Sequence, residues 1–216
     1  MRNLRKHQEA QLGFDGLLAS AEAENHDRQI ARESAHLPGT TDEALPFYRA
    51  LIERHHAAML AAHTEQVMQL RDEAHRLAVK LNNYEPGICA DDDSPGRALD
   101  RETRAADGSV PLWGQSGTFE VACKGMRVLI DMDGMFGIGA NYIAWLGFAA
   151  RAIEFDKPFL SETGFRSFIA PGGELVPGLT PDAFAVELIA AHVAKDCKGK
   201  LLTIKPEYRR MREAAS

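Results

Sequence analysis

Cysteine is scarce in this sequence. The 216 residues include three cysteines, and Cys89, Cys123 and Cys197 are too widely spaced to form a Cys-x-x-Cys pair. A zinc ribbon or a redox-active pair is therefore not expected. A Cys–His nucleophile is also unsupported, because His192 is the only histidine of the second half and lies about 140° from Cys197 around a helix.

Long hydrophobic runs and an excess of positive charge are also missing. No apolar stretch approaches the ~20 residues that a membrane-spanning helix needs. The first residues, MRNLRKHQEA, lack the apolar core of a signal peptide. We therefore expect a cytoplasmic protein without membrane contact. The net charge of -6 disfavours direct nucleic-acid binding, and it suggests protein partners instead.

Glycine is absent between Pro46 and Asn82, and this segment carries the strongest periodic pattern of the chain. Thr40 and Glu43 have the spacing of a capping box, which predicts a helix start. A helix of ~37 residues would be ~55 Å long, so it needs another helix to pack against, either residues 3–35 folded back or a second copy of the chain. The heptad seam that we expect to form this contact consists of His56, Leu60, His63, Val67, Leu70, Ala74, Leu77 and Leu81.

Two histidines on an otherwise apolar seam allow three interpretations. His56 and His63 could lie where the helix becomes solvated. They could instead form a contact that changes with protonation, since imidazole titrates near neutral pH. Glu53 and His56 also have the Glu-x-x-His spacing of di-iron bundles, but a second copy would have to come from a symmetric dimer.

Residues 83–113 have the composition of an acidic linker, with prolines, glycines and no apolar period. We interpret Asp91, Asp92 and Asp93 as a solvated loop, because a metal site would need further carboxylates from elsewhere. Trp113, at the end of this segment, is expected to cover the core. A base-stacking role is less favoured, because no basic and aromatic residues alternate around it.

The second half changes to a pattern of strands. TFEVACKGMRVLIDMDG predicts two strands around a Lys-Gly turn, FAARAIEF a strand or a helix, and GFRSFIAP and KLLTI further strands. TPDAFAVELIAAHVAKDCKG predicts a helix with Thr180 as its cap and Gly199 at its end. The expected fold is α+β: a long helical arm over 1–82, either a hairpin or coiled-coil-like, the linker, and a compact domain over 114–216. That domain is a small, mostly antiparallel sheet with one packed helix.

The stretch IDMDGMFGIGA, residues 130–140, is the first candidate site. Its glycines do not match a dinucleotide fingerprint or a phosphate-binding loop. Tyr142 stands where a calcium loop of the EF-hand type needs a glutamate. The simplest interpretation is a turn rich in glycine. The alternative is a metal or substrate site built on Asp131 and Asp133.

The second candidate is FLSETGFRSF, residues 159–168. Ser161, Glu162 and Arg166 lie among three phenylalanines, and an arginine beside hydroxyl groups can hold a carboxylate or a phosphate. The alternative is a hairpin that turns at Thr163 and Gly164, with the arginine in solvent.

Two functions remain open on the sequence alone. The first is a non-catalytic interaction protein, without a cofactor, whose helical arm serves homodimer formation or partner capture. One version of it modulates or inhibits a nucleic-acid-handling complex. The second is a metal-dependent enzyme or small-anion-binding protein with a site between residues 131–139 and 161–167. In that case the two aspartates would bind a metal or act as a base, and Arg166 would clamp the anion.

Overall fold

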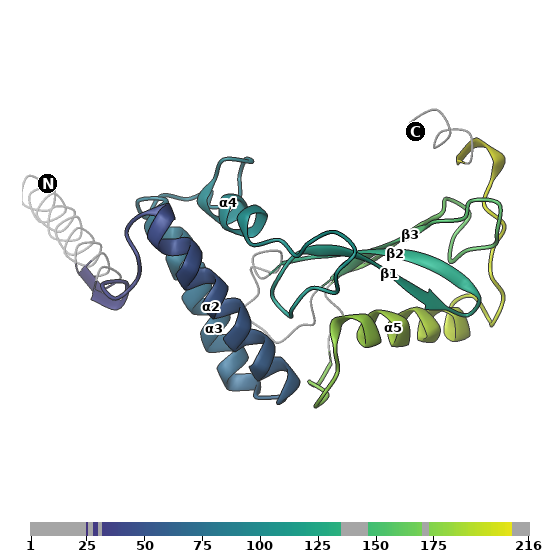
Figure 1. The fold of residues 1–216 in the computed structure, drawn as a ribbon, viewed down its shortest axis with the longest axis horizontal. Helices are drawn as coiled ribbons and strands as arrows, with labels where there is room; N and C mark the ends of the chain where they lie inside the picture. Colours follow the sequence, from purple (N-terminus) through teal and green to yellow (C-terminus); the bar gives the residue numbers. More distant parts are fainter. Residues whose placement is uncertain (1–24, 26–27, 30–31, 135–146, 170–172, 209–216) are drawn as a thin grey trace, which may run out of the picture. The chain divides into compact units, whose positions relative to one another are not determined.

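The computed structural model describes residues 25, 28–29, 32–134, 147–169 and 173–208 (Figure 1). The chain divides into two compact units, residues 1–37 and residues 38–216. All helices and strands named below belong to the second unit. This unit confirms the predicted α+β class, because a helical hairpin precedes a four-stranded antiparallel sheet with one packed helix. The predicted divisions at residues 82 and 113 stay predictions.

The prediction of one continuous helix over 46–82 is wrong. The segment forms α2 (Thr41–Leu60) and α3 (Thr64–Leu81), which pack side by side as a hairpin (Figure 1). Ala62 adopts a left-handed conformation with φ 54°. The N–H groups of Ala62 and His63 bond back to carbonyls in the last turn of α2 at 3.1 and 2.9 Å. This is a Schellman ending, with alanine where glycine is usual.

The seam residues are therefore used within one chain. Val67, Leu70, Ala74 and Leu77 are buried, and α3 packs on α2 and on the short helix that follows. Leu60 and Leu81 are half-buried, His56 is half-buried and His63 is exposed. The hairpin itself supplies a second helix for the apolar pattern, and a seam to a second copy stays a prediction.

The start of α2 confirms the predicted cap. Thr40 is the N-cap residue, and its hydroxyl accepts a bond from the Glu43 N–H at 3.4 Å. The Glu43 carboxylate reaches back to the N–H of Gly39, also at 3.4 Å. Pro46 lies inside the helix, beyond its first turn. The helix continues because Pro46 is exposed while Ala44 and Tyr48 anchor the buried face.

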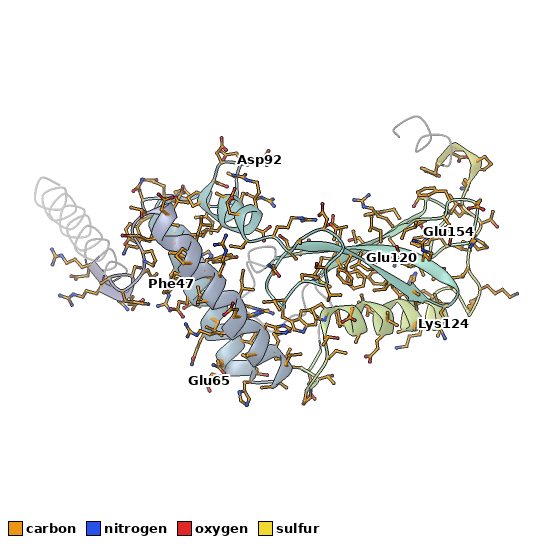
Figure 2. All side chains as sticks on the ribbon, viewed as in Figure 1. Phe47, Glu65, Asp92, Glu120, Lys124 and Glu154 are labelled. Carbon is orange, nitrogen blue, oxygen red and sulfur yellow. The ribbon has the colours of Figure 1, made fainter. Side chains whose placement is uncertain are left out.

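The predicted linker contains a helix, α4 (Pro95–Glu102). Its Leu99 is fully buried, and α4 packs on both α2 and α3. The short apolar pattern of this helix was not recognised among the surrounding charges. Asp91, Asp92 and Asp93 are exposed in the loop before it, as predicted, and Figure 2 shows Asp92 there.

The sheet has the order β1-β2-β3-β4, and all its neighbours are antiparallel. Its strands are β1 (Gly117–Cys123), β2 (Met126–Met132), β3 (Phe148–Ala152) and β4 (Phe165–Phe168). Lys124 and Gly125 form the tight turn between β1 and β2, both at positive φ, as a two-residue hairpin requires. The predicted strand over 200–204 is reduced to a single bridge between Phe159 and Leu202.

Helix α5 (Pro181–Lys195) covers one face of the sheet (Figure 1). Thr180 is its N-cap residue and Pro181 its first residue, as predicted, although the Thr180 side chain makes no capping bond. Phe184 meets Phe148 edge-on at 6.0 Å between ring centroids. The buried side of α5 and the inward residues of β1 to β3 thus form the core of the sheet region.

Candidate functional site

Trp113 fastens the helical hairpin to the sheet region. Its side chain is fully buried, which confirms its predicted place in the core. The indole N–H donates to the carbonyl of Leu179 at 2.8 Å, and the ring meets Phe184 edge-on at 5.4 Å. Two consecutive histidines of α2 hold its peptide groups: the Trp113 N–H donates to His56 Nδ1 at 3.0 Å, and its carbonyl lies 2.7 Å from His55 Nδ1.

His55 is fully buried and is held in one tautomer. Its Nε2 accepts a bond from Arg71 Nε at 3.1 Å, so Nδ1 must carry the proton that is donated to Trp113. Burial, together with the nearby Arg71 charge, lowers the pKa of His55 to about 3. Burial also lowers the pKa of Arg71 to about 10. The imidazole therefore acts as a neutral connector at neutral pH.

His56, which was predicted to lie on a seam, belongs to the same group of contacts. We call Trp113, His55, His56 and Arg71 together the Trp113 junction. Burial lowers its pKa, and its Nδ1 must be unprotonated to accept the Trp113 N–H. Glu53 is exposed and His63 lies at the loop between α2 and α3. Among the described residues, no three histidine, cysteine or acidic side chains are arranged to hold a metal ion. The pair Glu53 and His56 therefore has no metal-binding partners in this part of the chain.

The two aspartates of the first candidate site have different surroundings. Asp131 accepts from Arg104 at 3.4 Å and from the Thr118 hydroxyl at 3.3 Å. Asp133 is exposed, but desolvation still raises its pKa, and the charges of Asp131 and Asp100 raise it further. Asp131 is thus occupied by neighbouring side chains, whereas Asp133 favours its protonated form more than an ordinary aspartate does.

Asp100 of α4 is the third carboxyl group of this cluster, and the sequence reasoning missed it. Burial raises its pKa. A Cβ atom on Gly134 would lie 1.9 Å from an Asp100 carboxylate oxygen. Glycine is therefore required at position 134, because the backbone after β2 passes close to α4. This is a structural reason for one glycine of the predicted glycine-rich turn. The rest of that loop, residues 135–140, lies outside the described residues.

Residues 159–168, the second candidate site, form a turn that leads into β4. The Ser161 hydroxyl bonds both the N–H and the C=O of Phe165, at 3.1 and 2.7 Å. Glu162 forms an ion pair with Lys205 at 2.6 Å. Gly164 has φ 73°, which fits the predicted turn at this position. Ser161 and Glu162 thus have partners that belong to the fold.

The sheet register does not bring the two candidate sites together. Asp131 pairs with Ala149, which pairs with Ser167, so these three side chains share one face. Arg166 is the next residue of β4 and pairs with Ala150, on the opposite face that α5 covers. Alternation along a strand therefore separates Asp131 from Arg166, and both side chains are at least partly exposed.

The face of the sheet opposite α5 carries polar side chains from all four strands. One row across it consists of Glu120, Leu129, Arg151 and Phe165. Arg127 forms a two-pronged ion pair with Glu120 at 2.6 and 2.9 Å. Arg151 lies over the Phe165 ring at 4.9 Å. Figure 2 shows Glu120 on the sheet and Lys124 at its turn. We call the residues of this row together with Arg127 the open face.

The chain is similar to two curated proteins. Both are called Protein KlcB and come from Escherichia coli. One is 34% identical over 148 residues, which is 68% of this chain and 31% of that protein. The other is 29% identical over 208 residues, which is 95% of this chain and 47% of that protein.

This chain therefore spans between about a third and a half of each KlcB protein. No model of a protein family matches it, and no solved structure matches it. Among the described residues, no helix has both the length and the apolarity needed to cross a membrane.

The sequence reasoning missed His55, Arg71, Asp100 and Arg151. A signal existed for His55, which shares the helical period of Leu51, Ile52, Ala58 and Met59 on the buried face of α2. The heptad pattern places the neighbouring His56 on the seam instead, because it treats residues 46–82 as one continuous helix. Arg71 gave no such signal, because a charged residue beside Leu70 ordinarily indicates the end of an apolar stripe.

Proposed function

We propose that this chain acts in the cytoplasm as a non-catalytic module that binds another protein. One observation carries the proposal: the sheet is packed on α5 at one face, while its open face presents charged and aromatic side chains from all four strands. The Trp113 junction supports this reading, because it holds the hairpin and the sheet in one frame.

Self-association through the predicted seam has less support than partner capture. Val67, Leu70 and Leu77 are buried within the hairpin, so they offer no apolar surface to a second copy. The finer proposal, a partner that belongs to a nucleic-acid-handling complex, rests on the net charge of -6 alone.

The alternative proposal is an enzyme or anion-binding protein that uses the predicted loop site. The raised pKa of Asp133, which lies near the carboxylates of Asp131 and Asp100, is the observation that favours it. The occupied side chains of Asp131, Ser161 and Glu162 count against it.

Native mass spectrometry with metal analysis, followed by affinity capture from the native cells, tests the two proposals together. We expect a metal-free protein that recovers one partner in fixed stoichiometry, and that binds this partner again when both are purified. A stoichiometric metal that is lost in Asp133→Ala would overturn the proposal in favour of the loop site. A charge at a buried seam position, as in Leu70→Asp, would not test self-association. Leu70 is 1% exposed, so the charge would unfold the hairpin.

A further inference from the structure

The β3–β4 side of the open face combines an arginine with exposed apolar side chains. Arg151 and Phe165 are register partners, and the guanidinium lies 4.9 Å from the ring centroid. Phe165 is 41% exposed, and Ile169, just beyond β4, is 85% exposed. Aromatic side chains and arginine are both enriched at protein–protein interfaces.

Arg151 differs from the neighbouring arginines in its partners. Arg127 is paired with Glu120, and Arg104 with Asp131. Within the described residues, no carboxylate forms an ion pair with Arg151. A guanidinium whose face lies toward a ring can still use its N–H groups to bind a carboxylate in a two-pronged way.

The outer edge of β4 is blocked at the same place. The backbone N–H and C=O of Phe165 are both bonded by the hydroxyls of Ser161 and Thr163. A partner strand therefore cannot extend the sheet by pairing at Phe165. Recognition here has to use the side chains of the open face rather than backbone pairing.

We propose that Arg151 and Phe165 form a docking surface for a segment of a partner protein that carries a carboxylate beside an apolar side chain. Charge complementarity selects this chemistry, because the nearby acidic residues are already paired, Glu120 with Arg127 and Glu162 with Lys205. The carboxylate would bind the guanidinium that lies over the ring, and the apolar side chain would cover Phe165. This proposal rests on the proposed function and specifies its surface.

A random peptide display library, selected on the intact chain, tests this surface without knowledge of the partner. We expect selected peptides to be enriched in Asp or Glu next to Leu, Ile or Phe. Arg151→Gln and Phe165→Ala should each weaken the binding of a labelled selected peptide at least tenfold in fluorescence anisotropy. Arg151→Lys should have an intermediate effect, because it keeps the charge but loses the planar fork. Circular dichroism checks that each variant is folded.

Lys124→Gln is the matched control, since it removes one positive charge from the turn of the same sheet, at the position labelled in Figure 2. It should leave peptide affinity unchanged. Equal binding by wild type and Arg151→Gln would overturn this surface, as would an absence of acidic enrichment. Tight binding of a single-stranded oligothymidylate that depends on Arg151 and Phe165, without peptide binding, would overturn it in favour of nucleic acid. If the captured native partner binds Arg151→Gln normally, this surface fails while the proposed function stands.

Discussion

The Trp113 junction and the open face both contain arginine side chains, and these differ in their burial and in their partners. At the junction, Arg71 is 8% exposed and donates to a histidine that is itself fully buried. On the open face, both arginines are exposed: Arg127 pairs with Glu120, and Arg151 lies over the Phe165 ring. If a partner is removed, water can replace its contacts on the exposed open face, but not at the buried junction. The same residue type therefore stabilises the fold in one region and is available for binding in the other.

Removal of Arg71 should have the largest effect on stability. Arg71→Ala leaves His55 Nε2 without this donor inside the hairpin and removes the packing of the long side chain. We expect a loss of about 3 kcal/mol in the free energy of unfolding, measured by urea denaturation. Arg127→Ala, on the open face, is the control and should shift the urea midpoint far less. Similar midpoints for the two variants would contradict the comparison.

Acid should weaken the junction through His55. Its pKa is about 3 in the folded chain against 6.5 for an ordinary histidine, so the unfolded chain binds a proton that the folded chain does not. Stability is therefore complete above about pH 6.5 and falls by about 1.4 kcal/mol per pH unit as the pH drops toward 3. Urea titrations at several pH values measure this slope. His55→Gln should remove most of it, and an unchanged slope in that variant would show that other groups cause it.

The close approach of α4 to the end of β2 should be sensitive to one methyl group. In Gly134→Ala the new Cβ would lie 1.9 Å from an Asp100 oxygen, so the helix or the strand end must move. We expect a loss of about 1–3 kcal/mol in thermal or urea unfolding. Gly108→Ala tests positive φ without a steric clash, since it has φ 82° and no heavy atom within 4 Å of an added Cβ. A smaller loss in Gly134→Ala than in Gly108→Ala would argue against the close approach.

The smallest expected effect is a gain. Ala62 has φ 54°, a conformation that glycine adopts without the steric cost of a Cβ atom. Ala62→Gly should therefore raise the free energy of unfolding by about 0.5–1 kcal/mol. Ala61→Gly, one residue earlier at φ -83°, should lower it. A loss in both variants would mean that the hairpin loop differs from the one described.

The sheet was more predictable than the hairpin, and the reason lies in particular residues. Alternation in TFEVACK and the Lys124–Gly125 turn are local signals, and α5 has proline at its start and Gly199 after its end. The turn between α2 and α3 has no such signal. Alanine occupies the left-handed position, and the apolar spacing of three and four residues runs through the loop uninterrupted. Local pattern alone therefore favoured one long helix.

The candidate sites were limited by long-range contacts in the same way. The sequence identified Asp131, Asp133, Ser161, Glu162 and Arg166 as chemically capable side chains. Their partners come from distant segments: Arg104 and Thr118 for Asp131, and Lys205 for Glu162. No local pattern predicts which carboxylates will be neutralised by residues far along the chain.

By itself, the sequence determined the α+β class, the strands around the Lys124–Gly125 turn and the capped helix α5, because these depend on contacts between near neighbours. The tertiary structure decided that the seam closes within one chain, that His55 rather than His63 becomes a buried connector, and that Asp131 and Arg166 lie on opposite faces. Each of these depends on which distant surface a side chain meets. Burial against that surface sets both its charge state and whether it remains available to a partner.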